Sequence, residues 1–131
     1  MKLPIRVSDE SREPIYHQIE TQIISLIVSG QLQPGTPLPS IRELSSHLAC
    51  SAITTRKAYQ NLERGDYIKT VQGKGTFVKE VELEVRKNTK TKVVHDAFLK
   101  AVEQGERVGY TEAEMRTIFD EIISSYFLDK K

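Results

Sequence analysis

Apolar positions repeat every four residues near the start of the chain, in the series Ile15, Ile19, Ile23 and Ile27. This spacing keeps the side chains on one face of an α-helix. Pro14 suits the first helical turn, where its missing N–H costs nothing, and Gly30 is placed to end the helix. We therefore predict a first helix with a buried face between these two residues. Residues 3–7 predict a short strand before it.

A stiff segment separates this helix from two shorter ones. Residues 33–39 contain three prolines and one glycine, which exclude a helix and favour an extended loop. Ser40 and Glu43 then have the spacing of a capping box. A second helix is therefore predicted after Ser40, and its apolar face is formed by Leu44 and Leu48.

The third predicted helix runs from a cap at Ser51 to about Arg64, and Gly65 is placed to end it. Its inner face is expected to carry Ile53, Ala58 and Leu62. Only residues 49–51 separate it from the second helix, which is the spacing of a helix-turn-helix.

A hairpin pattern follows, with strands over residues 67–71 and 76–79 and a turn at residues 72–75. A β-hairpin directly after a helix-turn-helix is a wing. The chain is therefore predicted to be mostly α-helical with a small β wing, and residues 1–80 to form a winged helix-turn-helix domain.

The remainder of the chain divides into a linker and a helical region. Residues 81–90 are charged and weakly alternating, and we expect an extended linker. Residues 91–131 predict two antiparallel helices, the second opened by a capping box at Thr111 and Glu114. Their apolar stripe is wider than one partner helix requires, so we predict a symmetric dimer interface. The predicted interface residues are Val94, Phe98, Met115, Ile118, Phe119, Ile122, Ile123, Tyr126 and Phe127.

Charge distribution changes this picture more than the net charge of +1 does. Residues 21–79 hold seven basic residues against three acids, and no Asp or Glu occurs between Glu43 and Glu63. A helix in the major groove of DNA passes between rows of phosphates, where each acid would be repelled. The acid-free stretch covers most of the helix-turn-helix, which favours binding to double-stranded DNA.

Several side chains in this stretch lack a local partner. Arg42, Arg56 and Lys57 have no acid three or four residues onward, so a phosphate or a guanine edge could pair with them. The hydroxyls of Thr54 and Thr55 suit phosphate or base contact. In the wing, Lys74 lies between Gly73 and Gly75, whose backbones can approach a phosphate closely. These eight residues are the candidate DNA contacts.

The spaced motifs resemble those of the GntR family of bacterial regulators. They are residues 35–44 (GTPLPSIREL), Thr54 to Tyr59 (TTRKAY) and residues 73–78 (GKGTFV), with residues 14–19 (PIYHQI) before them. The resemblance covers about residues 3–80 and implies that Arg42, Arg56 and the wing tip are the principal DNA contacts. Ser40, within the first of these motifs, is a further candidate, and Ser51 at the start of the third predicted helix is another.

The short tail is similar to that of the YtrA-type subfamily, which implies dimerisation, repression and operons with transporter genes. It also implies a tail too small for a large effector pocket, and no effector is predicted. Family members commonly carry a polar or basic residue where this chain has Ala52 and a small polar residue where it has Ile53. We therefore expect Ser51 and Thr54 to make more of the backbone contacts.

Other classes of function are disfavoured. His17, His47 and His95 are scattered, and no spacing suits catalysis, a metal or a cofactor. The single cysteine, Cys50, cannot form an internal disulfide. No apolar run is long enough for the membrane and no signal peptide is apparent, so a cytoplasmic protein is expected. The alternative to a DNA-binding regulator is a winged helix used only for protein interaction, which would not need Arg42 or Arg56.

Overall fold

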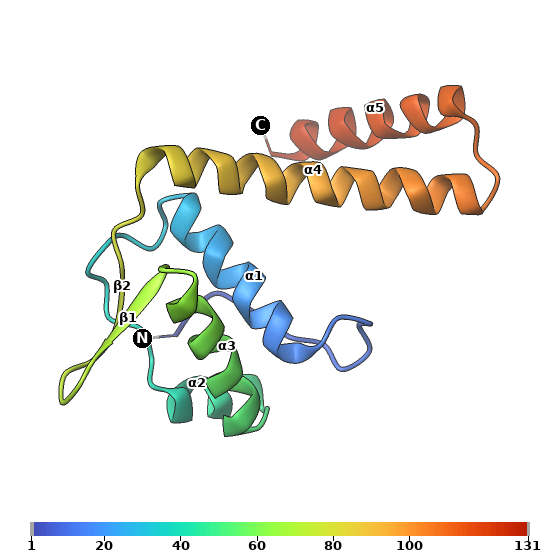
Figure 1. Ribbon diagram of the computed structural model, residues 1–131. Helices are drawn as coiled ribbons and strands as arrows, with labels where there is room; N and C mark the ends of the chain where they lie inside the picture. Colours follow the sequence, from blue (N-terminus) through green and yellow to red (C-terminus); the bar gives the residue numbers. More distant parts are fainter. Residues whose placement is uncertain (1, 131) are drawn as a thin grey trace. The chain divides into compact units, whose positions relative to one another are not determined.

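The computed structural model describes residues 2–130, and Figure 1 shows their arrangement. The elements are, in order, α1 (Ile15–Val28), α2 (Ile41–Leu48), α3 (Ala52–Arg64), β1 (Ile68–Val71), β2 (Gly75–Val78), α4 (Leu83–Arg107) and α5 (Glu112–Asp129). The prediction of a mostly helical chain with a two-stranded wing and two C-terminal helices is confirmed. The chain divides into two compact units, Met1–Lys90 and Thr91–Lys131.

The first unit has one hydrophobic core, to which α1, α2, α3 and both strands contribute. The fully buried large side chains include Ile19 and Ile23 of α1, Leu44 of α2, Leu62 of α3, Ile68 of β1 and Val78 of β2. Burying each such aliphatic side chain stabilises the fold by about 1.5–3 kcal/mol. The apolar residues that repeat every four positions in α1 therefore pack into this core.

Side-chain caps begin the two helices of the helix-turn-helix, as predicted. Ser40 Oγ accepts a hydrogen bond from the Glu43 backbone N–H (3.0 Å), and Glu43 Oε1 accepts one from the Ser40 N–H (3.2 Å). Ser51 Oγ accepts one from the Thr54 N–H (3.1 Å) and so caps α3. Ala49 ends α2 in the left-handed conformation, with φ of 55°, which turns the chain sharply between the helices.

The proline-rich segment supports the wing. β1 and β2 pair antiparallel, with Ile68 opposite Val78. On the free edge of β2, the Gly35 and Leu38 N–H groups donate to the carbonyls of Val78 and Thr76, each at 2.8 Å. The extended loop predicted over residues 33–39 is therefore hydrogen-bonded along the wing, which fixes the base of the hairpin.

The strand predicted over residues 3–7 is wrong, because this segment has no partner strand. Glutamine side chains of α1 supply the hydrogen bonds instead. Gln22 Oε1 accepts from the Arg6 N–H (3.0 Å), and Gln22 Nε2 donates to the Arg6 carbonyl (2.6 Å). Gln18, which is buried, bonds both backbone groups of Ser8 in the same way. The segment is therefore bonded to α1 without belonging to a sheet, and it contains a tight turn in which the Ile5 N–H donates to the Leu3 carbonyl (2.8 Å).

The extended linker predicted over residues 81–90 is also wrong. Helix α4 begins at Leu83 and continues for 25 residues, well before the predicted start at residue 91. Between Glu82 and Gln104 there is no glycine or proline, and Glu, Lys and Arg are good helix formers. Intrinsic helix propensity, without a buried apolar stripe, explains the helix.

The second unit is a pair of helices, formed by α5 and the part of α4 from Thr91 onward. The rings of Phe98 and Phe119 stack with centroids 6.3 Å apart. A Cβ on Gly105 would lie 2.6 Å from Met115 Sδ, so the glycine permits close approach of the helices. The capping box of Thr111 and Glu114 begins α5, as predicted. None of the side chains described in this unit is buried.

Candidate nucleic-acid interface

Helix α3 has a buried face and a solvent face, and the candidate DNA contacts are found on both. Thr55, Ala58, Tyr59 and Leu62 are buried, at spacings of three, four and seven residues. The solvent face carries Ala52, Ile53, Arg56, Lys57 and Gln60, all exposed. Between Ala52 and Gln60 this face contains no acid, and Glu63 near the end of α3 is the first exposed acid of the helix. The N-terminal part of α3 therefore presents a neutral-to-basic surface suited to the major groove.

Tyr59 fixes α3 to the segment before α2. Its hydroxyl, on a 5% exposed side chain, donates a 2.7 Å hydrogen bond to the Pro39 carbonyl. Burial, and secondly the charge of Glu43, raise the pKa of Tyr59 well above its usual value. The phenol therefore stays protonated and remains a donor. This bond positions the start of α2, where Ser40 and Arg42 lie.

Thr55 was expected to contact DNA, and this prediction is wrong. Its side chain is 0% exposed, and its Oγ1 accepts a 2.8 Å hydrogen bond from Ser45 Oγ of α2. Cys50 Sγ lies 3.4 Å from the same oxygen. The hydroxyl cluster joins the two helices of the helix-turn-helix internally. The phase of α3 could have identified it, because Thr55 lies three residues before Ala58 on the same stripe.

The position of Ile53 also differs from the prediction. It was predicted to pack on the inner face of α3, yet its side chain is 79% exposed. Thr55 lies two positions further along the chain, a rotation of about 200° around the helix, so Ile53 lies on the opposite face. Sequence reasoning therefore missed it as part of the outer surface.

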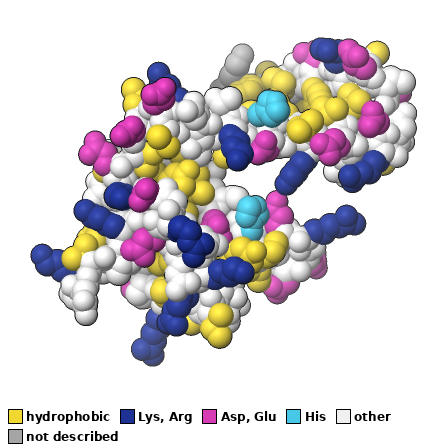
Figure 2. Space-filling view, in the orientation of Figure 1, with side chains coloured by type: hydrophobic (Ala, Val, Ile, Leu, Met, Phe, Trp, Pro, Cys, Tyr) yellow, Lys and Arg dark blue, Asp and Glu magenta, His cyan; other side chains and the backbone are white. Residues whose placement is uncertain are grey.

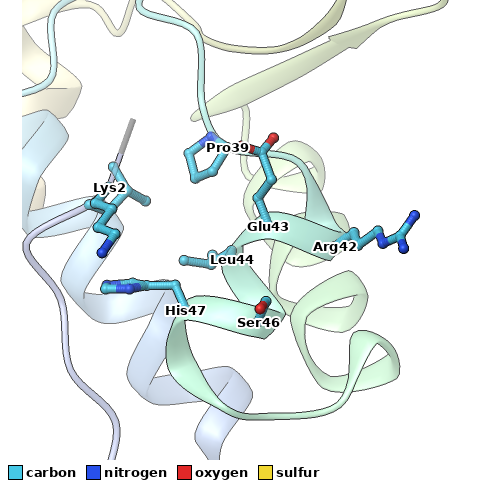
Figure 3. Close-up of a pocket in the computed structure, with 8 residues that line it drawn as sticks. Lys2, Pro39, Arg42, Glu43, Leu44, Ser46 and His47 are labelled. Carbon is cyan, nitrogen blue, oxygen red and sulfur yellow. The ribbon is translucent and has the colours of Figure 1, made fainter.

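Arg42 lies in the first turn of α2 and is exposed. Figure 3 shows an open hollow beside α2, toward which His47 and Lys2 project, whereas the Arg42 guanidinium extends away from it. Among the described residues 2–130, none forms an ion pair or hydrogen bond with the Arg42 side chain. The guanidinium is therefore free for a phosphate or a guanine.

The two cations of α3 differ in their surroundings. Arg56 is exposed and has no ion-pair partner within the part of the chain that the structure describes. Lys57 Nζ lies 4.1 Å from the centre of the Tyr16 ring of α1, a cation–π contact that the sequence did not indicate. Lys57 nevertheless remains exposed, so its charge contributes to the same surface.

The wing tip presents Lys74 between two glycines, and all three residues are exposed. Gly73 and Gly75 have φ of +80° and +120°, which side-chain-bearing residues rarely adopt. The Lys74 N–H donates to the Val71 carbonyl (2.9 Å) and closes the turn. The glycines are therefore required by the turn itself, and they also leave the backbone at the tip uncovered.

Each of the three acids in residues 21–79 is engaged by a neighbour. Glu43 belongs to the α2 cap, Glu63 Oε1 accepts from the Thr70 N–H (3.0 Å), and Asp66 lies 3.1 Å from Lys79 Nζ. Hydrogen bonds from the Ser40 backbone and hydroxyl lower the pKa of Glu43, so it stays charged at neutral pH. All three acids therefore have a bonding partner within the first unit, and Figure 2 shows Lys and Arg side chains exposed on the face that it presents.

Of the predicted contacts, the structure therefore leaves nine exposed or half-exposed on α2, α3 and the wing. They are Ser40, Arg42, Ser51, Thr54, Arg56, Lys57, Gly73, Lys74 and Gly75. The described residues contain no group of three or more His, Cys, Asp or Glu that could hold a metal ion. No helix among them has the length and apolar character needed to cross a membrane.

Comparison with known proteins agrees with this geometry. The model of the gntR family of bacterial regulatory proteins matches residues 15–78. The HTH-type transcriptional repressor YtrA of Bacillus subtilis (strain 168) is 37% identical over 76% of this chain and 72% of its own length.

Two solved structures extend the similarity. A transcriptional antiterminator from Listeria monocytogenes EGD-e is 32% identical, with a TM-score of 0.68, over 91% of this chain and 89% of that one. YtrA from Sulfolobus acidocaldarius, a GntR-family transcription factor, is 40% identical, with a TM-score of 0.56, over 72% and 97% of the two chains. These matches favour DNA binding over the protein-interaction alternative and over an enzyme. The chain belongs to the GntR family of bacterial regulatory proteins and is a DNA-binding transcriptional regulator.

Proposed function

We propose that the protein is a repressor that acts as a homodimer on a palindromic operator. The name of the Bacillus subtilis relative, a transcriptional repressor, supports repression. A target operon that encodes a transporter is part of the proposal, and it rests only on the resemblance of the short tail to the YtrA-type subfamily. Direct DNA contact is assigned to Arg42, Arg56 and the wing tip around Lys74.

The unburied apolar surface of the second unit is the observation that carries the dimer. Phe98, Ile122, Tyr126 and Phe127 are each more than half exposed, and Val94 is 52% exposed. Two helices of an isolated hairpin cannot bury such a stripe between themselves, and a contiguous apolar patch of this kind marks an interface. A second copy of the same hairpin offers a complementary face, which makes a symmetric four-helix arrangement.

The dimer explains how a small DNA-binding unit gains specificity. Two copies of α3 about 34 Å apart would enter successive major grooves on one side of the duplex. Each copy alone contributes few phosphate and base contacts. Joined copies bind both half-sites together, so their contributions combine in one binding event.

Removal of Arg42 tests the DNA-binding surface. We expect Arg42→Ala to cost about 1–3 kcal/mol of binding free energy and to relax sequence preference, because a base or phosphate contact is lost. Lys74→Ala should instead weaken all sequences alike and reduce the salt dependence of binding. Fluorescence anisotropy with selected and scrambled duplexes at several salt concentrations measures both effects.

Arg12→Ala is the matched control, because it removes an exposed arginine from the loop before α1. Its affinity should equal that of the unmodified protein. If Arg42→Ala and Lys74→Ala also bind DNA like the unmodified protein, the assigned surface is wrong.

A further inference from the structure

Ile53 is the most exposed large hydrophobic side chain of the winged helix. Among residues 2–81, only Ile53 (79%) and Val71 (36%) are large hydrophobics with exposed side chains. An exposed isoleucine adds nothing to the core and has a lower helix propensity than alanine. Neither packing nor helix formation therefore explains this residue at the second position of α3.

The surroundings of Ile53 are those of a base-reading surface. The N-terminal residues of a recognition helix are those that contact base edges in the major groove. In the first turn of α3, the neighbours Ser51, Ala52 and Thr54 are short, so the Ile53 side chain projects furthest. Arg56 lies three residues onward, on the same face, and is unpaired among the described residues.

An aliphatic side chain such as that of Ile53 can make a favourable contact only with an apolar group on a base edge. The major-groove edges of guanine, cytosine and adenine present only donors and acceptors, whereas thymine presents a 5-methyl group. We propose that Ile53 is a specificity-determining residue that contacts the 5-methyl group of a thymine in each half-site. The proposal rests on the sequence-specific DNA binding proposed above.

Helix geometry places this thymine relative to the Arg56 contact. Three residues of α-helix advance about 4.5 Å, and successive base pairs are about 3.4 Å apart. The thymine should therefore lie one or two base pairs from the position that Arg56 contacts. Because χ1 of isoleucine is held in one rotamer within a helix, little side-chain freedom is lost on contact.

Deoxyuridine substitution tests the contact one methyl group at a time. The operator is first obtained by selection from random duplexes with the full-length protein, and each thymine is then replaced by deoxyuridine. We expect one position per half-site to weaken binding about fourfold, the value of one buried methyl group, and about fifteenfold when both half-sites are changed. The remaining thymines of the same operator are the internal controls.

The Ile53→Ala variant, combined with the deoxyuridine substitution, forms a double-mutant cycle for the contact. This variant should bind the unmodified operator more weakly and should bind the deoxyuridine and thymine operators equally well at the sensitive position. Circular dichroism should show an unchanged fold, because the side chain is solvent-exposed. If no thymine is sensitive, or if Ile53→Ala retains the full deoxyuridine penalty, the contact is absent. Failure of the selection to enrich any sequence would instead contradict sequence-specific binding.

Discussion

Several polar side chains of this protein form hydrogen bonds within the fold, whereas the candidate DNA contacts Arg42 and Arg56 have no bonding partner among the described residues. Tyr59 and Thr55 point inward from α3, and each bonds a group of the α2 region. Glu43 is held by the cap it forms with Ser40. Arg42 and Arg56 have no such role, which is why they are available for a ligand.

The Tyr59 hydroxyl should contribute measurably to stability. Tyr59→Phe leaves the buried Pro39 carbonyl without its donor, and we expect the free energy of unfolding to fall by about 1–3 kcal/mol. Chemical denaturation monitored by circular dichroism measures the difference. Tyr110→Phe, at a 45% exposed position, is the control and should change stability by less than about 0.5 kcal/mol. Equal stability of both variants would show that the bond does not stabilise the fold.

The α2 cap should make stability depend on pH in the acid range. The pKa of Glu43 is lowered in the folded protein from its ordinary value of 4.5 by hydrogen bonds from Ser40. The stabilisation is complete above pH 4.5 and is lost as pH falls through the lowered folded-state value. We therefore expect thermal stability to fall less steeply below pH 4.5 in Glu43→Gln than in the unmodified protein.

Glu121→Gln provides the comparison, because it removes an exposed glutamate that has no capping role. Parallel acid-stability curves for Glu43→Gln and the unmodified protein would contradict the role given to the cap.

Among the elements, those with strong local signals could be predicted from the sequence. The caps at Ser40, Ser51 and Thr111 begin helices as their spacing indicates, and the glycine-bearing turn closes the wing. The start of α4 could not be found from periodicity, because no described residue of this helix is buried. The segment over residues 3–7 was misassigned because glutamine side chains of α1 replace a strand partner, a contact that depends on the tertiary fold.

Within the candidate site, residue types could be predicted but not all of their directions. Arg42, Arg56 and Lys74 are exposed as required, since charged side chains in short helices and turns rarely bury alone. Thr55 and Ile53 were placed on the wrong faces of α3. A threonine fits both a buried and an exposed position. An isoleucine is most often buried, so its apolar character alone favours a core position. Only the phase set by Ala58 and Leu62 distinguishes the faces.

The wing should depend on the backbone conformation of Gly75. With φ of +120°, this residue cannot accept a side chain without strain, and the strain costs about 1–3 kcal/mol. We expect Gly75→Ala to accelerate amide exchange at Gly35 and Leu38, which donate to β2, by about 10- to 100-fold. Gln72→Ala, in the same turn without positive φ, should leave exchange unchanged. Normal exchange in Gly75→Ala would show that the wing tolerates a side chain there.

At the scale of the whole molecule, the two units differ in how completely their apolar side chains are buried. The first unit has a complete core and carries the basic α2–α3 and wing surface. The second unit has no buried residue in its described part, yet it exposes Phe98, Ile122, Tyr126 and Phe127. In the proposed dimer a second copy would cover these side chains, and pairing would double the number of DNA contacts.

Sedimentation velocity of the full-length protein at micromolar concentration tests this central claim most directly. We predict a single species with the mass of two chains, about twice 14.9 kDa, and its conversion to monomer by Ile122→Asp, which places a charge in the apolar stripe. Leu83→Asp, at an exposed position outside the second unit, should remain dimeric. A monomer in the unmodified protein at this concentration would contradict the proposed dimer and the palindromic operator inferred from it.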